Sequence, residues 1–200
     1  MHNKGITVAL MVIFICFSFA TAQNNPFAKG SLGVWEEFYF QSSGGDAWEN
    51  NDGDRETEMQ NNTTVGYFIM PGVAVGGQFM LDRTSQGDYK DTMWGFGPSA
   101  TYFLGGGDVN GSVKGSVFPF ATVGFVYLKG NTEYSSGADF EFTATIFGGD
   151  VGAMYMLNSF VGFSGSIGYQ LWSFNSDDIP NDREDGNKFN LNAGFTIFIP

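Results

Sequence analysis

The chain ends in an alternating segment, and this segment constrains the fold more than any other. From Phe189 to Ile199 the odd positions are apolar, while the even positions from Asn190 to Thr196 are Asn, Asn, Gly and Thr, with Phe198 as the exception. A half-buried strand of a water-soluble protein usually carries Lys or Glu on its wet face. Small uncharged groups instead fit a strand with lipid on one side and a narrow polar lumen on the other. The segment therefore predicts a strand of a membrane-spanning β-barrel.

The same alternation recurs upstream and predicts eight strands. The expected strands span residues 31–41, 62–70, 73–82, 93–104, 117–128, 140–156, 160–172 and 188–199. No window of the sequence has helical periodicity. The connections alternate in length: those at residues 71–72, 105–116 and 157–159 are tight or Gly-rich, and those at residues 42–61, 83–92, 129–139 and 173–187 are long and polar. Short periplasmic turns and long extracellular loops are typical of a bacterial membrane barrel, and an even strand number puts both chain ends on the short-turn side.

Three of the expected strands depart from simple alternation. The first carries the adjacent carboxylates Glu36 and Glu37, so one of them must face outward at an interface or lie at a bulge. The strand at residues 117–128 is apolar on both faces. In the strand at residues 140–156 the alternation changes parity near Gly148, which predicts a bulge there.

Aromatic side chains gather near the expected strand ends, as amphipathic rings do at the headgroup level of a membrane. The residues expected in these girdles are Trp35, Tyr39, Trp94, Tyr102, Phe125, Tyr127, Tyr155, Tyr169 and Trp172. The alternative, ordinary core aromatics, fails because the sequence predicts too few helices to cover a sheet.

Polar side chains on the opposite face are expected to fill the lumen. These residues are Glu37, Gln78, Asp82, Asp150, Gln170 and Lys188. Ionisable groups at membrane depth cost several kcal/mol unless paired, so we expect them to bind one another or nearby Ser, Thr and Asn side chains. The interior of an eight-stranded barrel is just wide enough for side chains to fill. A closed network is favoured, a narrow water-filled path is the alternative, and a wide pore is not expected.

Residues 1–22 have the layout of a secretory signal peptide. Lys4 and the amino terminus supply the positive region, an apolar run follows, and Ala-Thr-Ala at its end forms a small-residue cleavage site. The apolar run is shorter than the ~20 residues that a membrane-spanning helix needs. We expect cleavage between Ala22 and Gln23, which leaves residues 23–200 as one secreted domain.

The composition excludes several classes of function. His2 and Cys16 are the only histidine and cysteine, and both lie in the expected leader. The mature chain then lacks the base of Ser-His-Asp or Cys-His catalysis and the usual ligands of zinc, so we expect neither an enzyme nor a cofactor. The formal net charge is −12. No basic patch exists to neutralise phosphates, so no nucleic acid is expected as a partner.

Acidic residues concentrate in two of the long connections. Residues 42–61 and 173–187 together hold 11 of the 21 Asp and Glu residues. The segment from Asp52 resembles a calcium loop, but Thr57 stands where an EF-hand requires Gly, so an EF-hand is rejected. The candidates for weaker contact with Ca²⁺ or Mg²⁺ are Asp52, Asp54, Glu56, Asp182 and Asp185. A solvated acidic rim that resists aggregation is the favoured interpretation, and no dedicated metal site is expected.

These features resemble the small eight-stranded outer-membrane barrels, the OmpX-like and OmpA-transmembrane-like family. The resemblance covers residues 29–200 and rests on the leader, the rhythm of strands and loops, and the ending of the chain. The residues that resemble the polar-x-Gly-x-x-apolar-x-apolar signal for barrel assembly are Asn192, Gly194, Ile197 and Ile199. Family members commonly end on Phe, whereas this chain ends on Pro200 with Phe198 third from the end.

The resemblance implies an all-β, eight-stranded antiparallel up-and-down barrel in the bacterial outer membrane. Its partners would be outer-membrane lipid, lipopolysaccharide and, during biogenesis, the barrel assembly machinery. We expect a structural or surface-interaction role through the acidic extracellular loops, with an unidentified extracellular ligand and no catalysis. The alternatives are a narrow porin-like channel for small solutes or ions and a soluble lipocalin-like ligand-binding barrel.

Overall fold

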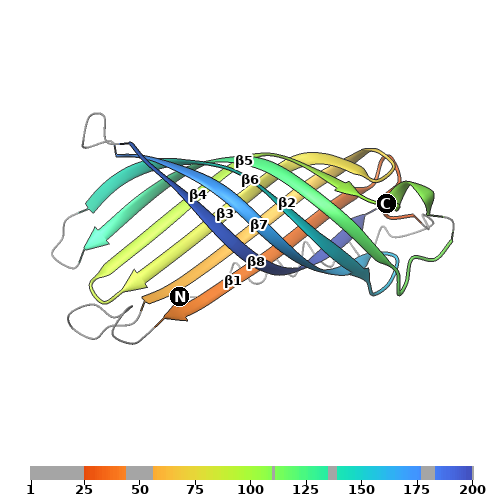
Figure 1. Cartoon of the computed structure of the whole chain (residues 1–200), viewed down its shortest axis with the longest axis horizontal. Helices are drawn as coiled ribbons and strands as arrows, with labels where there is room; N and C mark the ends of the chain where they lie inside the picture. The colour runs from red at the N-terminus through yellow and green to blue at the C-terminus, as the bar shows by residue number, and fades with distance from the viewer. Residues whose placement is uncertain (1–24, 44–55, 110, 135–138, 177–182, 200) are drawn as a thin grey trace, which may run out of the picture.

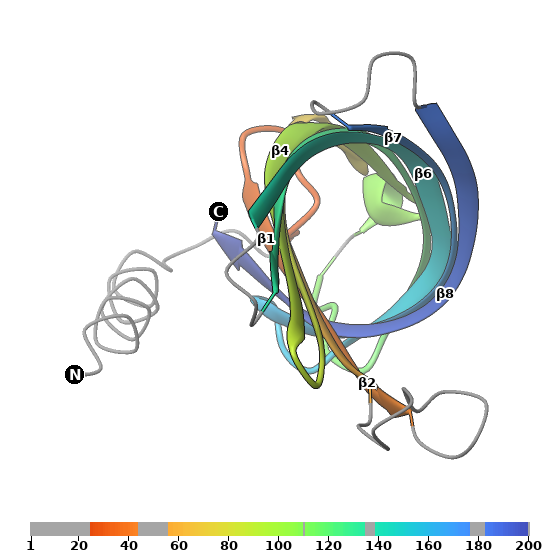
Figure 2. The ribbon, with the colours of Figure 1, turned by 90° about the vertical axis from the view of Figure 1, so that its left-hand side faces the viewer.

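Eight antiparallel strands close into one up-and-down barrel in the computed structural model, which describes residues 25–43, 56–109, 111–134, 139–176 and 183–199 (Figures 1 and 2). The elements are β1 (Leu32–Ser43), β2 (Glu56–Met70), β3 (Val73–Gln86), β4 (Tyr89–Phe103), the short 3-10 helix η1 (Gly106–Asp108), β5 (Val117–Tyr134), β6 (Asp139–Met156), β7 (Val161–Ser176) and β8 (Arg183–Ile199). Each strand pairs with its neighbours in the chain, and β8 pairs with β1. The predicted fold is confirmed. Among these residues no helix is long and apolar enough to cross a membrane.

The strands run further toward one rim than the alternation predicts. We call this rim extracellular and the opposite rim, which carries both ends of the barrel chain, periplasmic. β3 and β4 are joined by Gly87 and Asp88 alone, with Gly87 at φ 54°. The long polar loop predicted at residues 83–92 is therefore wrong, and β2, β5, β7 and β8 also extend into segments predicted as loops. Backbone pairing thus continues beyond the residues that show apolar alternation, so this alternation marks only part of each strand.

The bulge predicted in β6 is also wrong. The pairing of β6 with β5 and with β7 keeps one register through Gly148 and its neighbours. The composition of the two faces changes instead: Ala144 and Ile146 are buried on the lumen side nearer the extracellular rim, and Val151 faces outward nearer the periplasmic rim. The apolar residues lie on the inward face in the first half of β6 and on the outward face in the second half. In the sequence this pattern looks like a change of parity.

The outer face of the barrel is apolar over much of its area. Side chains that are between 41% and 69% exposed on it include Trp94, Phe96, Tyr102, Phe125, Tyr127, Phe147, Val151, Tyr155, Phe163, Ile167, Tyr169, Leu191 and Phe195. A continuous surface of this kind is unfavourable in water and matches hydrocarbon. The outer face is apolar, whereas a soluble barrel has a polar outer face, so the lipocalin-like alternative is not supported.

Six of the nine residues predicted for the aromatic girdles face outward, although Phe125 and Tyr169 lie in the middle of β5 and β7 and not near a strand end. Those that face outward are Trp94, Tyr102, Phe125, Tyr127, Tyr155 and Tyr169. Trp35 and Trp172 instead face the lumen and are 9% and 7% exposed, so their assignment to a girdle was wrong. Both lie near strand ends, but strand parity puts them on the inner face. The side chain of Tyr39 lies outside the described part of the chain.

The adjacent carboxylates of β1 point to opposite faces without a bulge. β1 keeps one register with β2 through Glu36 and Glu37, and Glu37 lines the lumen. Glu36 faces outward and accepts hydrogen bonds from the amide of Asn61 and from Thr63 Oγ1, the latter at 2.6 Å. Because an unpaired carboxylate is costly at membrane depth, these two donors stabilise Glu36 on the lipid side of the wall.

Candidate functional site

The lumen is divided into three layers, the first of which is an aromatic plug at the periplasmic end. Its centre is Phe27, which is fully buried, with its ring centroid 4.6 Å from that of Phe118 and 4.9 Å from that of Phe103. The other buried members of the plug are Trp35, Phe68, Ala74, Val113, Phe120, Met154, Met156 and Phe198. Rings at these distances pack as in a protein core. The plug explains why Phe198 breaks the polar inner face of the last strand.

Hydrogen bonds from the segment before β1 hold Phe27 in the barrel. The backbone N–H of Gly72 donates to the carbonyl of Phe27 at 2.9 Å, and that of Gly30 donates to the carbonyl of Phe68 at 2.9 Å. The side-chain amide of Asn25 donates to the carbonyl of Gly106 at 3.2 Å. The segment is thus tied to the end of β2, to the β2–β3 turn and to η1, which makes the plug part of the barrel.

A polar layer fills the middle of the lumen. Asn192 donates to Asp150 Oδ1 at 3.0 Å and to Ser166 Oγ at 3.4 Å, and Asn190 donates to Asn192 Oδ1 at 3.0 Å. Gly168 makes room for this network, because a Cβ atom at that position would lie 2.1 Å from Asp150 Oδ1. The polar residues predicted to face the lumen line its cavities. Asp150 binds an asparagine as expected, but Asp82 Oδ1 has no hydrogen-bond partner among the described residues.

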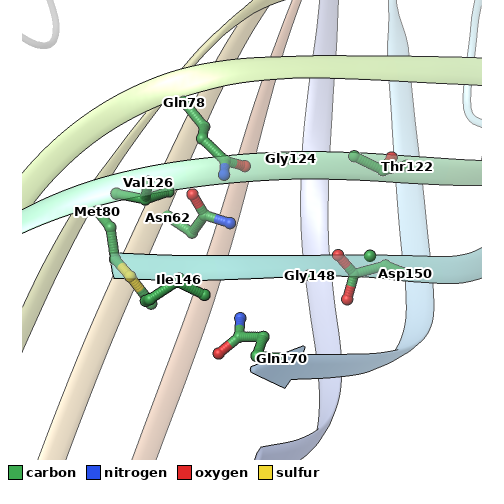
Figure 3. Close-up of a pocket in the computed structure, with 11 residues that line it drawn as sticks. Asn62, Gln78, Met80, Thr122, Gly124, Val126, Ile146, Gly148, Asp150 and Gln170 are labelled. Carbon is green, nitrogen blue, oxygen red and sulfur yellow. The ribbon is translucent and has the colours of Figure 1, made fainter. Parts of the chain in front are cut away.

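Two small cavities remain in the polar layer. The larger, of about 20 Å³, is approached by Asn62, Gln78, Asp150 and Gln170 from four strands (Figure 3). The other, of about 10 Å³, lies beside Glu37. A cavity needs roughly 10–15 Å³ to hold one water molecule. These two cavities therefore admit isolated waters.

The extracellular end of the lumen is a vestibule of about 320 Å³. Its lining comes from five strands and comprises Glu58, Asp82, Thr84, Met93, Trp172, Phe174, Gly186, Asn187 and Lys188. Its floor is a buried apolar cluster of Met80, Val126, Leu128, Ala144, Ile146 and Trp172, with Met93 and Phe174 packed against it. The vestibule is thus open toward the outside and closed toward the polar layer.

One wall of the vestibule is aromatic. The rings of Trp172 and Phe174 are stacked, with centroids 5.5 Å apart and planes at 14°. Trp172 Nε1 donates to Gln170 Oε1 at 3.2 Å, which fixes the indole from the polar layer below. The wall therefore presents an apolar surface to the cavity.

Charged side chains from β2, β3 and β8 complete the lining. Lys188 forms an ion pair with Glu58. Asp82 is 3% exposed, and its Oδ1 has no hydrogen-bond partner among the described residues. The vestibule therefore combines an acidic wall with an aromatic one.

No family model and no curated protein matches this sequence. The structure is similar to that of Neisserial surface protein A (NspA), with a TM-score of 0.56 and 15% identity, over 84% of this chain and 97% of that chain. The chain has the fold of a small outer-membrane β-barrel. Lower TM-scores relate it to the outer membrane protein OprG from Pseudomonas aeruginosa (0.46, 15% identity, 88% of this chain and 99% of that chain) and to Ail, the attachment invasion locus protein of Yersinia pestis (0.44, 13% identity, 84% and 99%). The expected location in the outer membrane agrees with this fold and with the apolar outer face.

The divalent-ion candidates are not brought together in the described structure. Asp52, Asp54, Asp182 and the side chain of Glu56 lie outside the described residues, as do the expected cleavage residues Ala22 and Gln23. Asp185 lies in β8 opposite Ser173 of β7. Within the residues that the structure describes, no three His, Cys, Asp or Glu side chains could hold a metal ion together.

The residues of the assembly-like ending lie at the seam that closes the barrel. Ile197 pairs with Val34 and Ile199 with Leu32, while Asn192 belongs to the polar layer. A Cβ atom at Gly194 would lie 2.3 Å from the carbonyl oxygen of Glu36, so glycine permits the close approach of β8 to β1. A role in assembly stays a prediction.

Sequence reasoning missed the residues that define the two ends of the lumen. Phe27 stands in an irregular lead, where no periodicity indicates that it is buried. Trp172 and Phe174 follow the inward parity of β7, and this parity was the available signal that both rings face the lumen.

Proposed function

We propose that this protein is an outer-membrane barrel that is closed to solutes and acts by binding at its extracellular mouth. The observation that carries the proposal is the asymmetry of the lumen. An aromatic plug fills the periplasmic end, and a cavity of about 320 Å³ opens at the other end. A fold of this kind hosts many functions, so the function of this barrel follows from its site and not from its similarity to other barrels.

The acidic composition of the extracellular rim supports a surface role. The two acid-rich segments join β1 to β2 and β7 to β8 at this rim, next to the strands that carry Glu58 and Lys188 of the vestibule. Their negative charge would repel anionic surfaces and attract cationic partners. The apolar band below the rim contacts outer-membrane lipid, and lipopolysaccharide would be its neighbour in the outer leaflet.

The narrow channel finds no support in the described lumen. A conducting path would have to cross both the plug and a polar layer whose cavities hold about 20 Å³ and 10 Å³. Eight-stranded barrels have interiors that side chains can fill, and here the side chains of the plug fill the periplasmic end.

Closure is tested by reconstituting the folded protein into planar bilayers and into sugar-loaded liposomes. We expect no conductance steps and no swelling, with a wide porin as the positive control. Steps that scale with the amount of folded protein and vanish when the protein is unfolded before reconstitution would overturn the proposal.

Binding at the mouth is tested separately by saturation-transfer NMR on the folded barrel in nanodiscs, with empty nanodiscs as the blank. Three probes that share a phenyl ring and differ in charge are benzoate (an anion), 2-phenylethanol (neutral) and 2-phenylethylammonium (a cation). We expect saturable binding of at least one of them, weakened by a substitution in the vestibule such as Phe174→Ala. Failure of all three would refute binding at the mouth by small molecules of this size.

A further inference from the structure

The vestibule contains a buried carboxylate that the protein itself leaves incompletely satisfied. Asp82 lines the cavity and is 3% exposed, and its Oδ1 has no hydrogen-bond partner in the described part of the chain. Buried polar atoms in native structures are nearly always bonded, and an exception calls for a ligand, an ion or a water. The cavity of about 320 Å³ has the size of a small-molecule site.

The charges around the cavity favour a cationic ligand. Two carboxylates, Glu58 and Asp82, and one ammonium group, that of Lys188, lie in the lining, which leaves one net negative charge. Lys188 is bonded to Glu58 and so is not available to hold an anion without breaking that pair. The described residues offer no third ligating side chain for a metal ion. The counter-charge that fits this wall is a monovalent ammonium group.

The aromatic wall favours a ligand that has an apolar part as well as a charge. Trp172 and Phe174 are stacked and packed on the apolar floor together with Met93. An aromatic ring of a ligand can stack on such a wall, and an ammonium group over the face of an indole gains a cation–π interaction. An inorganic cation or a wholly polar polyamine would leave this surface in contact with water.

From these walls we infer that the vestibule binds small organic monocations in which an ammonium group is joined to an aromatic ring or a short alkyl chain. The inference rests on the proposed function and names the ligand class of its site. The ammonium group donates to Asp82, and the apolar part packs against Trp172, Phe174 and Met93.

The three probes of the NMR experiment separate this inference from the proposed function. The inference requires that 2-phenylethylammonium binds saturably to the folded barrel and more tightly than 2-phenylethanol, which has the same ring without the charge. It also requires that benzoate does not compete. Tighter binding of benzoate or of the alcohol would overturn the ligand class and leave binding at the mouth intact, and failure of all three probes would overturn both.

Matched variants assign the binding to the two walls. Asp82→Asn keeps the shape of the side chain and removes its charge. We expect it to weaken the binding of 2-phenylethylammonium about ten-fold or more, while the binding of 2-phenylethanol changes little. Asp88→Asn is the control, because Asp88 is an exposed acid in the β3–β4 turn. Trp172→Phe tests the aromatic wall in the same way, and Trp94→Phe on the outer face is its control.

Each variant is first checked for an electrophoretic mobility in detergent that shifts on boiling, as expected of a folded barrel. Loss of binding is then not confused with loss of fold. Equal binding of 2-phenylethylammonium by the wild type and by folded Asp82→Asn would overturn the inference. The same loss of binding in Asp88→Asn as in Asp82→Asn would also overturn it, because a diffuse acidic rim would then account for the affinity.

Discussion

The two ends of the lumen are built from similar side chains and reach opposite results. Both contain phenylalanine, tryptophan and methionine on inward positions of the strands. At the periplasmic end the segment before β1 inserts Phe27 among them, and the space is filled. At the extracellular end the described chain supplies no such residue, and a cavity of about 320 Å³ remains. An inward aromatic cluster becomes a seal or a binding wall according to whether the chain provides a side chain to fill its centre.

Phe27→Ala should have the largest effect on stability, because it empties the centre of the plug. Phe27 is fully buried and contacts the rings of Phe103 and Phe118 closely. Removing a buried phenylalanine costs about 3–5 kcal/mol. The measurement is urea unfolding of the reconstituted barrel, in which the folded fraction is read from the electrophoretic band that shifts on boiling.

The control for this variant is Phe96→Ala on the outer face, where the side chain is 69% exposed and would lose only lipid contact. We expect a much smaller shift of the urea midpoint for the control. Equal shifts of the urea midpoint in the two variants would show that Phe27 is not part of a tightly packed core.

Gly168→Ala should have the next largest effect, because it damages the layer that separates the two ends. Its Cβ would lie 2.1 Å from Asp150 Oδ1 and 2.4 Å from Asn190 Oδ1, so both side chains must move. Overpacking of this kind costs about 1–3 kcal/mol. The matched control is Gly165→Ala on the same strand, where the nearest atom lies at 3.9 Å. Urea midpoints that fall equally in the two variants would indicate a general cost of removing glycine from β7 and not a crowded polar layer.

Lys188→Met should lower stability by roughly 1–3 kcal/mol, since it leaves Glu58 with a charge and without its ammonium partner. The double variant Glu58→Gln/Lys188→Met removes both charges and should recover part of the loss, which a double-mutant cycle of urea midpoints measures. Strictly additive losses would mean that the pair contributes nothing beyond its two separate side chains.

The sequence predicted the wall of the barrel better than its contents. Alternation identifies which residues face lipid, because lipid imposes the same apolar requirement on every outward position, and Val75, Phe163 and Leu191 are outward as predicted. The lumen imposes no single requirement, since it holds a plug, a polar network and a cavity in turn. Phe27 belongs to a core whose other members lie far from it in the sequence, and no local sequence pattern predicts that these residues pack together.

The extended strands illustrate the same limit. Tyr89, Asp91 and Thr132 lie in segments that read as polar loop, but Asp91 accepts hydrogen bonds from the side chains of the other two across the β4–β5 ladder and along β4. Backbone pairing needs no apolar side chains, so strands beyond the membrane leave only a weak trace in the sequence. Of the vestibule residues, Glu58, Thr84, Phe174, Gly186 and Asn187 come from segments predicted as loops, whereas Asp82 and Lys188 were predicted to face the lumen. The candidate site could not be assembled before the structure, because half of its lining left no strand pattern in the sequence.

Phe174→Ala should have the smallest effect on stability, and it tests the contrast between the two ends most directly. Phe174 is half-buried, with one face on Trp172 and the other toward the vestibule, so its removal widens an existing cavity and creates no closed void. The cost should be about 1–2 kcal/mol, which reflects partial loss of buried apolar area without a full cavity term. The urea midpoint of Phe174→Ala should therefore lie well above that of Phe27→Ala. If the two phenylalanines proved equally costly, the vestibule would be a packed core like the plug, and neither binding at the mouth nor an organic cation between its two walls would retain a structural basis.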